Sequence, residues 1–153
     1  MEVLLQIVTN SNINVTKSDS EDVWSELTHL CDSQECNITM LKILLKLNEN
    51  IDSLEVTTKK TILMFACGSK NKNSDMVVEE ILKYNPNIDL EDYCGKKAIE
   101  YATLRKNCNT IKLLTEHARI NNLINGLKSE NKELQLENNN LKRKFKDLQD
   151  SIK

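Results

Sequence analysis

The sequence predicts an all-α protein, with a short helical-repeat solenoid followed by a long C-terminal coiled-coil helix. Three observations support this fold class. The 153 residues include only three Gly and one Pro, too few for the frequent turns of a β-sandwich or barrel. Clusters of apolar residues recur about every 36 residues, which is typical of stacked helical units. The last third of the chain carries a heptad pattern, which predicts a helix that pairs with another helix.

The length suits one small domain with an appended segment. We expect an N-terminal cap or half repeat over residues 1–20, about three repeats over residues 21–118, and the coiled-coil helix over residues 119–153. Aromatic residues make up only 4% of the chain. The core of the repeats must therefore consist mainly of aliphatic side chains.

Charge and apolar runs exclude several classes of partner. Residues 1–118 hold 13 basic and 18 acidic side chains, and residues 119–153 hold 8 basic and 5 acidic ones. Neither part is charged strongly enough to require nucleic acid or a membrane as a partner. No apolar run reaches the ~20 residues of a membrane helix, and the start MEVLLQIV lacks a basic signal-peptide region. We therefore expect a cytoplasmic protein whose five cysteines are reduced thiols.

Short-range signals indicate where the repeats begin and how they recur. Ser18 and Glu21 form a capping-box pattern that opens a helix, with one buried face made of Val23, Trp24, Leu27, Leu30 and Cys31. Leu27, Leu63 and Ile99 are each 36 residues apart, and so are Leu30, Ala66 and Ala102. Two of the repeat units end in Asn-Ile-Asp, at residues 50–52 and 87–89. Each unit is therefore read as helix, loop, helix and polar connector.

These residues resemble the ankyrin repeat. The signature D-x-x-G-x-T-P-L-H-x-A is matched at Asp92, Gly95, Ala98, Ile99 and Ala102, and Ile111 to Leu114 match the second helix of that family. Thr61 to Ala66 match T-P-L-H-x-A one repeat earlier. The resemblance covers about Val23 to Leu114. The Asn- and Ile-rich composition is similar to ankyrin proteins of large DNA viruses, which implies the cytoplasm of a host cell.

The sequence also departs from the ankyrin pattern. Repeats one and two carry extra residues between their helices, in CDSQECNIT and CGSKNKNSD. The tip between Glu55 and Thr61 is one residue longer than in the ankyrin pattern and lacks the turn glycine. Lys97 and Ala98 stand where the family has Thr-Pro. The alternative is an irregular helical bundle in which the 36-residue spacing arises by chance.

The resemblance implies recognition of a protein partner through the finger tips and inner helices. The residues of this chain at those positions are Lys59, Lys60, Tyr93, Cys94, Lys96 and Arg105.

The heptads predict a parallel homodimer through residues 120–152. Ile120, Leu127, Leu134, Leu141 and Leu148 occupy d, and Ile124, Asn131, Asn138, Phe145 and Ile152 occupy a. Leucine at d favours two parallel strands, and a buried Asn at a pairs with its twin only when the strands are in register. A different partner, a higher oligomer, an antiparallel hairpin and a monomeric helix remain alternatives. Asn125-Gly126 is turn chemistry, but the heptad phase continues across it, which favours a continuous, locally weakened helix over a hinge.

No pattern in the sequence indicates catalysis or a bound cofactor. The only histidines are His29 and His117, no Gly-rich phosphate loop exists, and His29, Cys31 and Cys36 match no common zinc spacing. Residues 104–119 hold four basic residues and one acidic residue, too few for the basic region of a DNA-binding zipper. We therefore predict no catalytic residues, no metal and no cofactor. The predicted function is non-enzymatic protein binding, made bivalent by the coiled coil; the alternative is an assembly protein whose coiled coil is the functional part.

Overall fold

The computed structural model describes residues 17–33, 36–48 and 50–152, and within these ranges every regular element is a helix. The helices are α2 (Lys17–Asp32), α3 (Ile38–Leu47), α4 (Ile62–Gly68), α5 (Ser74–Leu82), α6 (Ala98–Leu104) and α7 (Cys108–Ser151). The predicted all-α class is confirmed. Most of the predicted N-terminal cap, residues 1–16, lies outside the described residues. Helix α2 begins one residue before Ser18, so the predicted capping residue is inside the helix.

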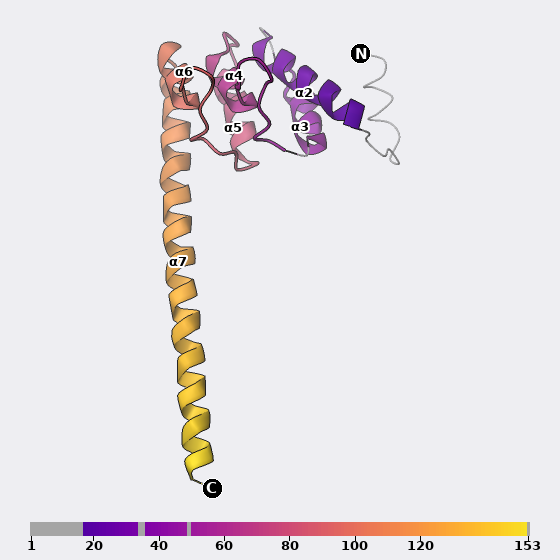
Figure 1. Cartoon of the computed structure of the whole chain (residues 1–153). Coiled ribbons are helices and arrows are strands. Elements are labelled where there is room, and N and C mark those ends of the chain that lie inside the picture. The colour runs from indigo at the N-terminus through magenta and orange to yellow at the C-terminus, as the bar shows by residue number, and fades with distance from the viewer. Residues whose placement is uncertain (1–16, 34–35, 49, 153) are drawn as a thin grey trace. The chain divides into compact units, whose positions relative to one another are not determined.

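The helices of the repeats form two rows. Helices α2, α4 and α6 contact one another in sequence order, and α3 contacts α5 in the second row. Each of the first two units is a contacting pair, α2 with α3 and α4 with α5 (Figure 1). This is the stacked arrangement that the 36-residue period predicts, because a single helix pair cannot bury its apolar face alone.

An aliphatic core joins the two rows. Its largest fully buried side chains are Leu27, Leu41, Leu44, Leu45, Ile62, Leu63, Met64, Val77, Val78, Ile81 and Leu114. Ala66 and Ala102 are completely buried, and their small side chains allow the inner helices to approach closely. Ile99, at the position of Leu27 and Leu63, is instead 39% exposed. The reason is its place on α6, which has an inner-row neighbour, α4, on only one side.

Different side chains accept hydrogen bonds from backbone N–H groups at the starts of α3, α4 and α6. Asn37 accepts a hydrogen bond from the backbone N–H of Met40 at 3.1 Å and so caps α3. The Thr61 hydroxyl caps α4 by accepting from Met64 N–H at 3.3 Å. Lys97 has no such acceptor, and the carboxylate of Glu100 accepts from the Lys97 N–H at 2.7 Å. Glu100 therefore satisfies one backbone donor where the ankyrin pattern has Thr-Pro.

Helix α7 is continuous from Cys108 to Ser151. By packing, the chain divides into two units between Leu114 and Thr115, so the first residues of α7 belong to the repeats, where Thr110 and Leu114 are buried. The helix passes through Asn125-Gly126 without a break, as the heptad phase predicts (Figure 1). Among the described residues no helix combines the length and apolarity that crossing a bilayer requires.

Candidate protein interface

Two tight turns project from the connectors, and we call them the first finger (residues 55–60) and the second finger (residues 92–96). In the first finger the N–H of Glu55 donates to the carbonyl of Lys60 at 2.9 Å. In the second, the N–H of Asp92 donates to the carbonyl of Lys96 at 3.0 Å. The fingers are joined because Tyr93 N–H donates to the Thr58 carbonyl at 2.9 Å. They therefore form one continuous backbone surface.

A carboxylate organises the first finger from within. Glu55 accepts hydrogen bonds from the backbone N–H and hydroxyl groups of Thr57 and Thr58, at 2.6–3.1 Å. Hydrogen bonds to a carboxylate favour its charged form, and those from Thr58 and then Thr57 lower the pKa of Glu55 to about 2. The first finger is thus an ordered turn although it lacks the family's glycine.

Asp92 plays the same part in the second finger. Its Oδ1 accepts from the N–H groups of Cys94 and Lys96, each at 2.8 Å, and its Oδ2 accepts from the hydroxyl of Tyr101. Burial alone would raise the pKa of Asp92, but these hydrogen bonds outweigh burial and hold it below its ordinary value. Burial and the bond to Asp92 raise the pKa of Tyr101. The turn is therefore anchored to the inner helix α6.

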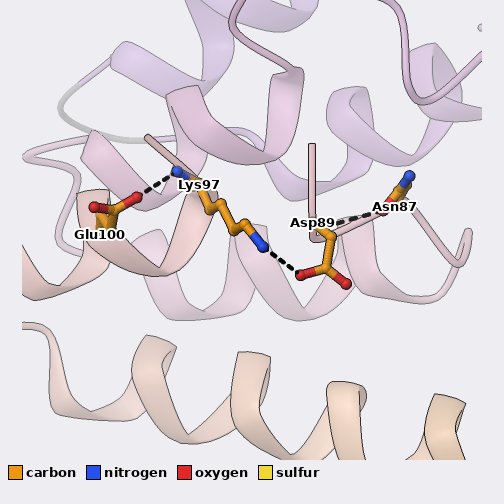
Figure 2. A network of polar contacts seen from close by, with 4 residues as sticks. All are labelled: Asn87, Asp89, Lys97 and Glu100. Atoms are coloured by element: carbon orange, nitrogen blue, oxygen red, sulfur yellow. Dashed lines mark hydrogen bonds and ion pairs between the residues drawn. The ribbon is translucent and has the colours of Figure 1, made fainter. Parts of the chain in front are cut away.

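The Asn-Ile-Asp endings link the two connectors. In each, the Asn side chain accepts a hydrogen bond from the Asp N–H two residues later at 3.0 Å, Asn50 from Asp52 and Asn87 from Asp89. Asp52 then accepts from the Asn87 N–H at 2.8 Å, which joins one repeat to the next. Asp89 accepts from Lys97 Nζ at 3.0 Å (Figure 2). The shared motif therefore links the two connectors to each other, and the second connector to Lys97, by hydrogen bonds.

Lys60 sits against two aromatic rings of the inner helices. Its Nζ lies 4.7 Å from the ring centroid of Tyr101 and 5.6 Å from that of Phe65, both within cation–π range. Phe65 also meets Trp24 edge to face, with centroids 5.9 Å apart. Sequence reasoning missed this cluster. The spacing of Phe65 and Tyr101, which are 36 residues apart, could have indicated that the two rings occupy equivalent positions in neighbouring repeats.

The structure brings five of the six predicted binding residues together. Lys59 and Lys60 lie on the first finger, and Tyr93, Cys94 and Lys96 lie on the second. The side chain of Tyr93 is 80% exposed. Arg105 is apart from them, because it follows the far end of α6, where its Nε donates to the Gly68 carbonyl at 2.7 Å.

Comparison with known proteins identifies these repeats. A protein-family model described as ankyrin repeats, in three copies, matches residues 4–124. The chain belongs to the ankyrin-repeat family. Ankyrin repeats indicate a protein–protein interaction module, and the family is generally non-enzymatic. No curated protein matches the chain.

Solved structures share the ankyrin fold of this chain. One is a chain from the structure described as the predatory endopeptidase Bd0816 from Bdellovibrio bacteriovorus in complex with the immunity protein Bd3460. Its TM-score is 0.51 at 20% sequence identity, over 60% of this chain. The ankyrin-repeat protein described here covers only 45% of that chain, so the likeness is one of fold.

Beyond the ankyrin repeats, α7 carries nine of the ten predicted heptad positions, and all ten side chains are exposed. The leucines at d are open to a similar degree, from 56% at Leu127 to 62% at Leu148. Phe145 is 62% exposed. Ile152 follows the last residue of the helix. An exposed row of large apolar side chains on one helix is the pattern of a surface that is covered by a partner.

Proposed function

We propose that this ankyrin-repeat protein is a non-enzymatic binding protein that displays two copies of its repeats as a parallel homodimer joined through residues 120–152. The observation that carries the proposal is the uninterrupted helix α7 with apolar d positions exposed along its length. A helix with so narrow an apolar stripe gains most by pairing its stripe with another helix. A second copy of the chain supplies an identical heptad pattern.

The polar a positions support a parallel, in-register pair. Asn131 and Asn138 interrupt the apolar seam one heptad apart. In a parallel dimer each side-chain amide can hydrogen-bond to its twin, whereas a shifted or antiparallel pairing buries it against apolar groups. Glu137 at g also faces Lys142 at e of the partner in that arrangement, an attractive pair. These features lower the stability of the dimer but specify its register.

Dimerisation would change how tightly the repeats hold a partner. The proposed contact surface consists of the two fingers, through Lys59, Lys60, Tyr93, Cys94 and Lys96, and Arg105 at the far end of α6 is a separate proposed contact. Two such surfaces on one dimer can engage a multivalent target together, and the second contact is then intramolecular. Avidity can exceed single-site affinity by about 100-fold when the geometry permits both contacts.

We also propose that the protein acts in the cytoplasm. Cys36, Cys67, Cys94 and Cys108 are free thiols, which supports a reducing, cytoplasmic environment. Burial raises the pKa of Cys67 to about 12, so this thiol is inert packing material. An origin in a large DNA virus, and hence a host cytoplasm, stays a prediction from composition.

A matched pair of leucines tests the dimer. Leu134 at d and Leu136 at f are each 58% exposed in the single chain and lie on the same stretch of helix. Only the d residue would be buried in the dimer. We expect Leu134→Gln to weaken self-association by about 100-fold or more, because two buried leucines are lost per dimer. Leu136→Gln should leave association unchanged.

Sedimentation equilibrium of the full-length chain and both variants measures this difference. The proposal requires a dimer for the unmodified chain and for Leu136→Gln at tens of micromolar, with Leu134→Gln shifted towards monomer. A monomeric unmodified chain at that concentration, or equal effects of the two substitutions, would rule it out. Circular dichroism of each variant separates lost pairing from lost folding of the repeats.

A further inference from the structure

A polar cleft of about 560 Å³ lies at the end of the repeats away from the fingers, between the loop joining α4 to α5 and the loop joining α6 to α7. Its lining residues come from these two loops and the first turns of α5 and α7. They are Ser69, Lys70, Asn71, Lys72, Ser74, Arg105, Lys106, Asn107, Cys108 and Asn109. The α4–α5 loop is one of the two that carry extra residues relative to the ankyrin pattern.

Hydrogen bonds hold the two loops at a fixed separation. The side-chain amide of Asn107 donates to the Ser74 hydroxyl at 3.0 Å, and its Oδ1 accepts from the Thr110 N–H at 3.2 Å. The Nε of Arg105 reaches across to the Gly68 carbonyl at 2.7 Å. Arg105 and Asn107 thus connect the two loops by hydrogen bonds, which fix the shape of the cleft.

The charge of the cleft is one-sided. Lys70, Lys72, Arg105 and Lys106 line it, and the described residues contribute no acidic side chain to its lining. All four cations belong to residues that are exposed. The rest of residues 1–118 is net acidic, with nine basic and 18 acidic side chains. Four cations in one cleft therefore contrast with their surroundings.

An unused donor lies in the wall of this cleft. Asn71 is only 4% exposed, and its Oδ1 accepts from the Asn73 N–H at 2.8 Å. Its Nδ2 has no hydrogen-bond partner within the described part of the chain. A buried amide nitrogen without a partner is costly, and an acceptor oxygen placed in the cleft would relieve that cost.

We propose that this cleft binds a short acidic segment of a partner protein, with the side-chain carboxylates paired to Lys70, Lys72, Arg105 and Lys106. Carboxylate oxygens suit both the cations and the Asn71 amide donor. Among the described residues that line the cleft there is no aromatic side chain on which a base would stack. The carboxylate of Asp75 lies beside the cleft, where its Oδ2 accepts from Asn109 Nδ2 at 3.5 Å, and it disfavours a long polyanion that extends past the cleft. These features favour a peptide over a nucleic acid.

This inference rests on the proposed role in protein binding but not on dimerisation. The cleft is formed within one copy of the repeats, and its residues do not include the heptad positions. It also separates Arg105 from the finger surface: partners would contact the fingers at one end of α6 and the basic cleft at the other.

Titration of the full-length protein into fluorescein-labelled octaglutamate, followed by fluorescence anisotropy, tests the cleft directly. We expect saturable binding that weakens as salt is added. The double variant Lys70→Gln with Lys72→Gln should lower the affinity about tenfold, the loss of two ion pairs. The control is Lys132→Gln with Lys146→Gln, which removes the same charge from exposed b positions of the more basic helix and should change the affinity less than about twofold.

Several outcomes would overturn the proposal. If the labelled octaglutamate does not bind at millimolar protein concentration, the site is excluded. Equal losses of affinity in the two double variants would show non-specific electrostatic attraction. Tighter binding of a labelled octathymidylate would point to nucleic acid instead. Because each measurement can be made on monomer or dimer, a failed coiled coil and a failed cleft give different results. Circular dichroism confirms that the lysine variants are folded.

Discussion

Lys59 and Gly95 occupy the same kind of position in the two fingers, with φ values of 60° and 71°. Glycine adopts this left-handed region at no cost, whereas a side chain with a Cβ is strained there. The first finger tolerates Lys59 because the Glu55 carboxylate holds the turn through Thr57 and Thr58.

Opposite substitutions at these two positions should have opposite effects. We expect Lys59→Gly to raise the free energy of unfolding by about 0.5–1 kcal/mol and Gly95→Ala to lower it by about 1 kcal/mol. A Cβ at Gly95 would approach only Glu91 Oε2, at 4.0 Å, so its cost comes from the backbone. Urea unfolding measures both, with Lys59→Ala as the control for lost charge. Changes of the same sign would contradict this explanation of the first finger.

Acid should weaken the fold through the finger carboxylates. The pKa of Glu55 in the folded chain is about 2, against an ordinary value of 4.5. A lowered pKa stabilises the fold fully above the ordinary value, and the contribution is lost as the pH falls from 4.5 towards 2. We expect Glu55→Gln to flatten the dependence of unfolding free energy on pH in that window, with Glu91→Gln as the control. Identical slopes for both variants would show that Glu55 is not involved.

The sequence indicates some of these residue roles and hides others. Asp92 could be assigned to its turn because Gly95 follows at the spacing of the ankyrin signature. Glu55 has no such glycine after it, and its role depends on two threonines folding back onto one carboxylate. The place of Lys60 between Phe65 and Tyr101 depends on tertiary contacts between α4, α6 and the first finger, which residue order alone does not reveal.

Among the elements, helix α7 belongs both to the repeats and to the proposed coiled coil. Its first turns bury Thr110 and Leu114 in the repeats, and its later turns carry the heptads. The heptad phase predicted this continuity correctly across Asn125-Gly126. The bounds of the α4–α5 loop and its basic cleft could not be predicted in the same way, because extra residues relative to the repeat pattern give no signal of how they fold.

Gly126 offers a test of that continuity. Apart from its chain neighbours and the backbone of its own helix, no atom of the described residues lies within 4 Å of a Cβ built at this glycine, and alanine is favoured over glycine inside a helix by about 1 kcal/mol. We therefore expect Gly126→Ala to raise the helical content and the midpoint of thermal unfolding of the C-terminal segment, measured by circular dichroism at 222 nm. Asn139→Ala, on the same helix far from the glycine, is the comparison. A lower midpoint for Gly126→Ala would indicate that the chain bends at this glycine.

For the whole molecule, the family match and the stacked helices establish an ankyrin-repeat protein. Periodicity was sufficient to predict this because every repeat must bury the same face against its neighbour. Pairing between chains is a different matter, since the heptads specify a partner of matching pattern and one chain cannot display it. The finger surface and the acidic-segment cleft are likewise proposals about partners.

The parallel, in-register pairing of residues 120–152 is the central claim, and distances between spin labels on two copies measure it most directly. Labels are attached at Ser129→Cys or at Asp150→Cys, both f positions, in a Cys94→Ser and Cys108→Ser background. The claim predicts a similar short separation at both sites, on the order of 20–25 Å, because parallel helix axes lie about 8–10 Å apart. An antiparallel pair centred on residue 136, the midpoint of 120–152, would offset the two Asp150 labels by about 42 Å along the helix axis and the two Ser129 labels by about 21 Å, at about 1.5 Å per residue. That result, or no intermolecular distance at all, would contradict the account.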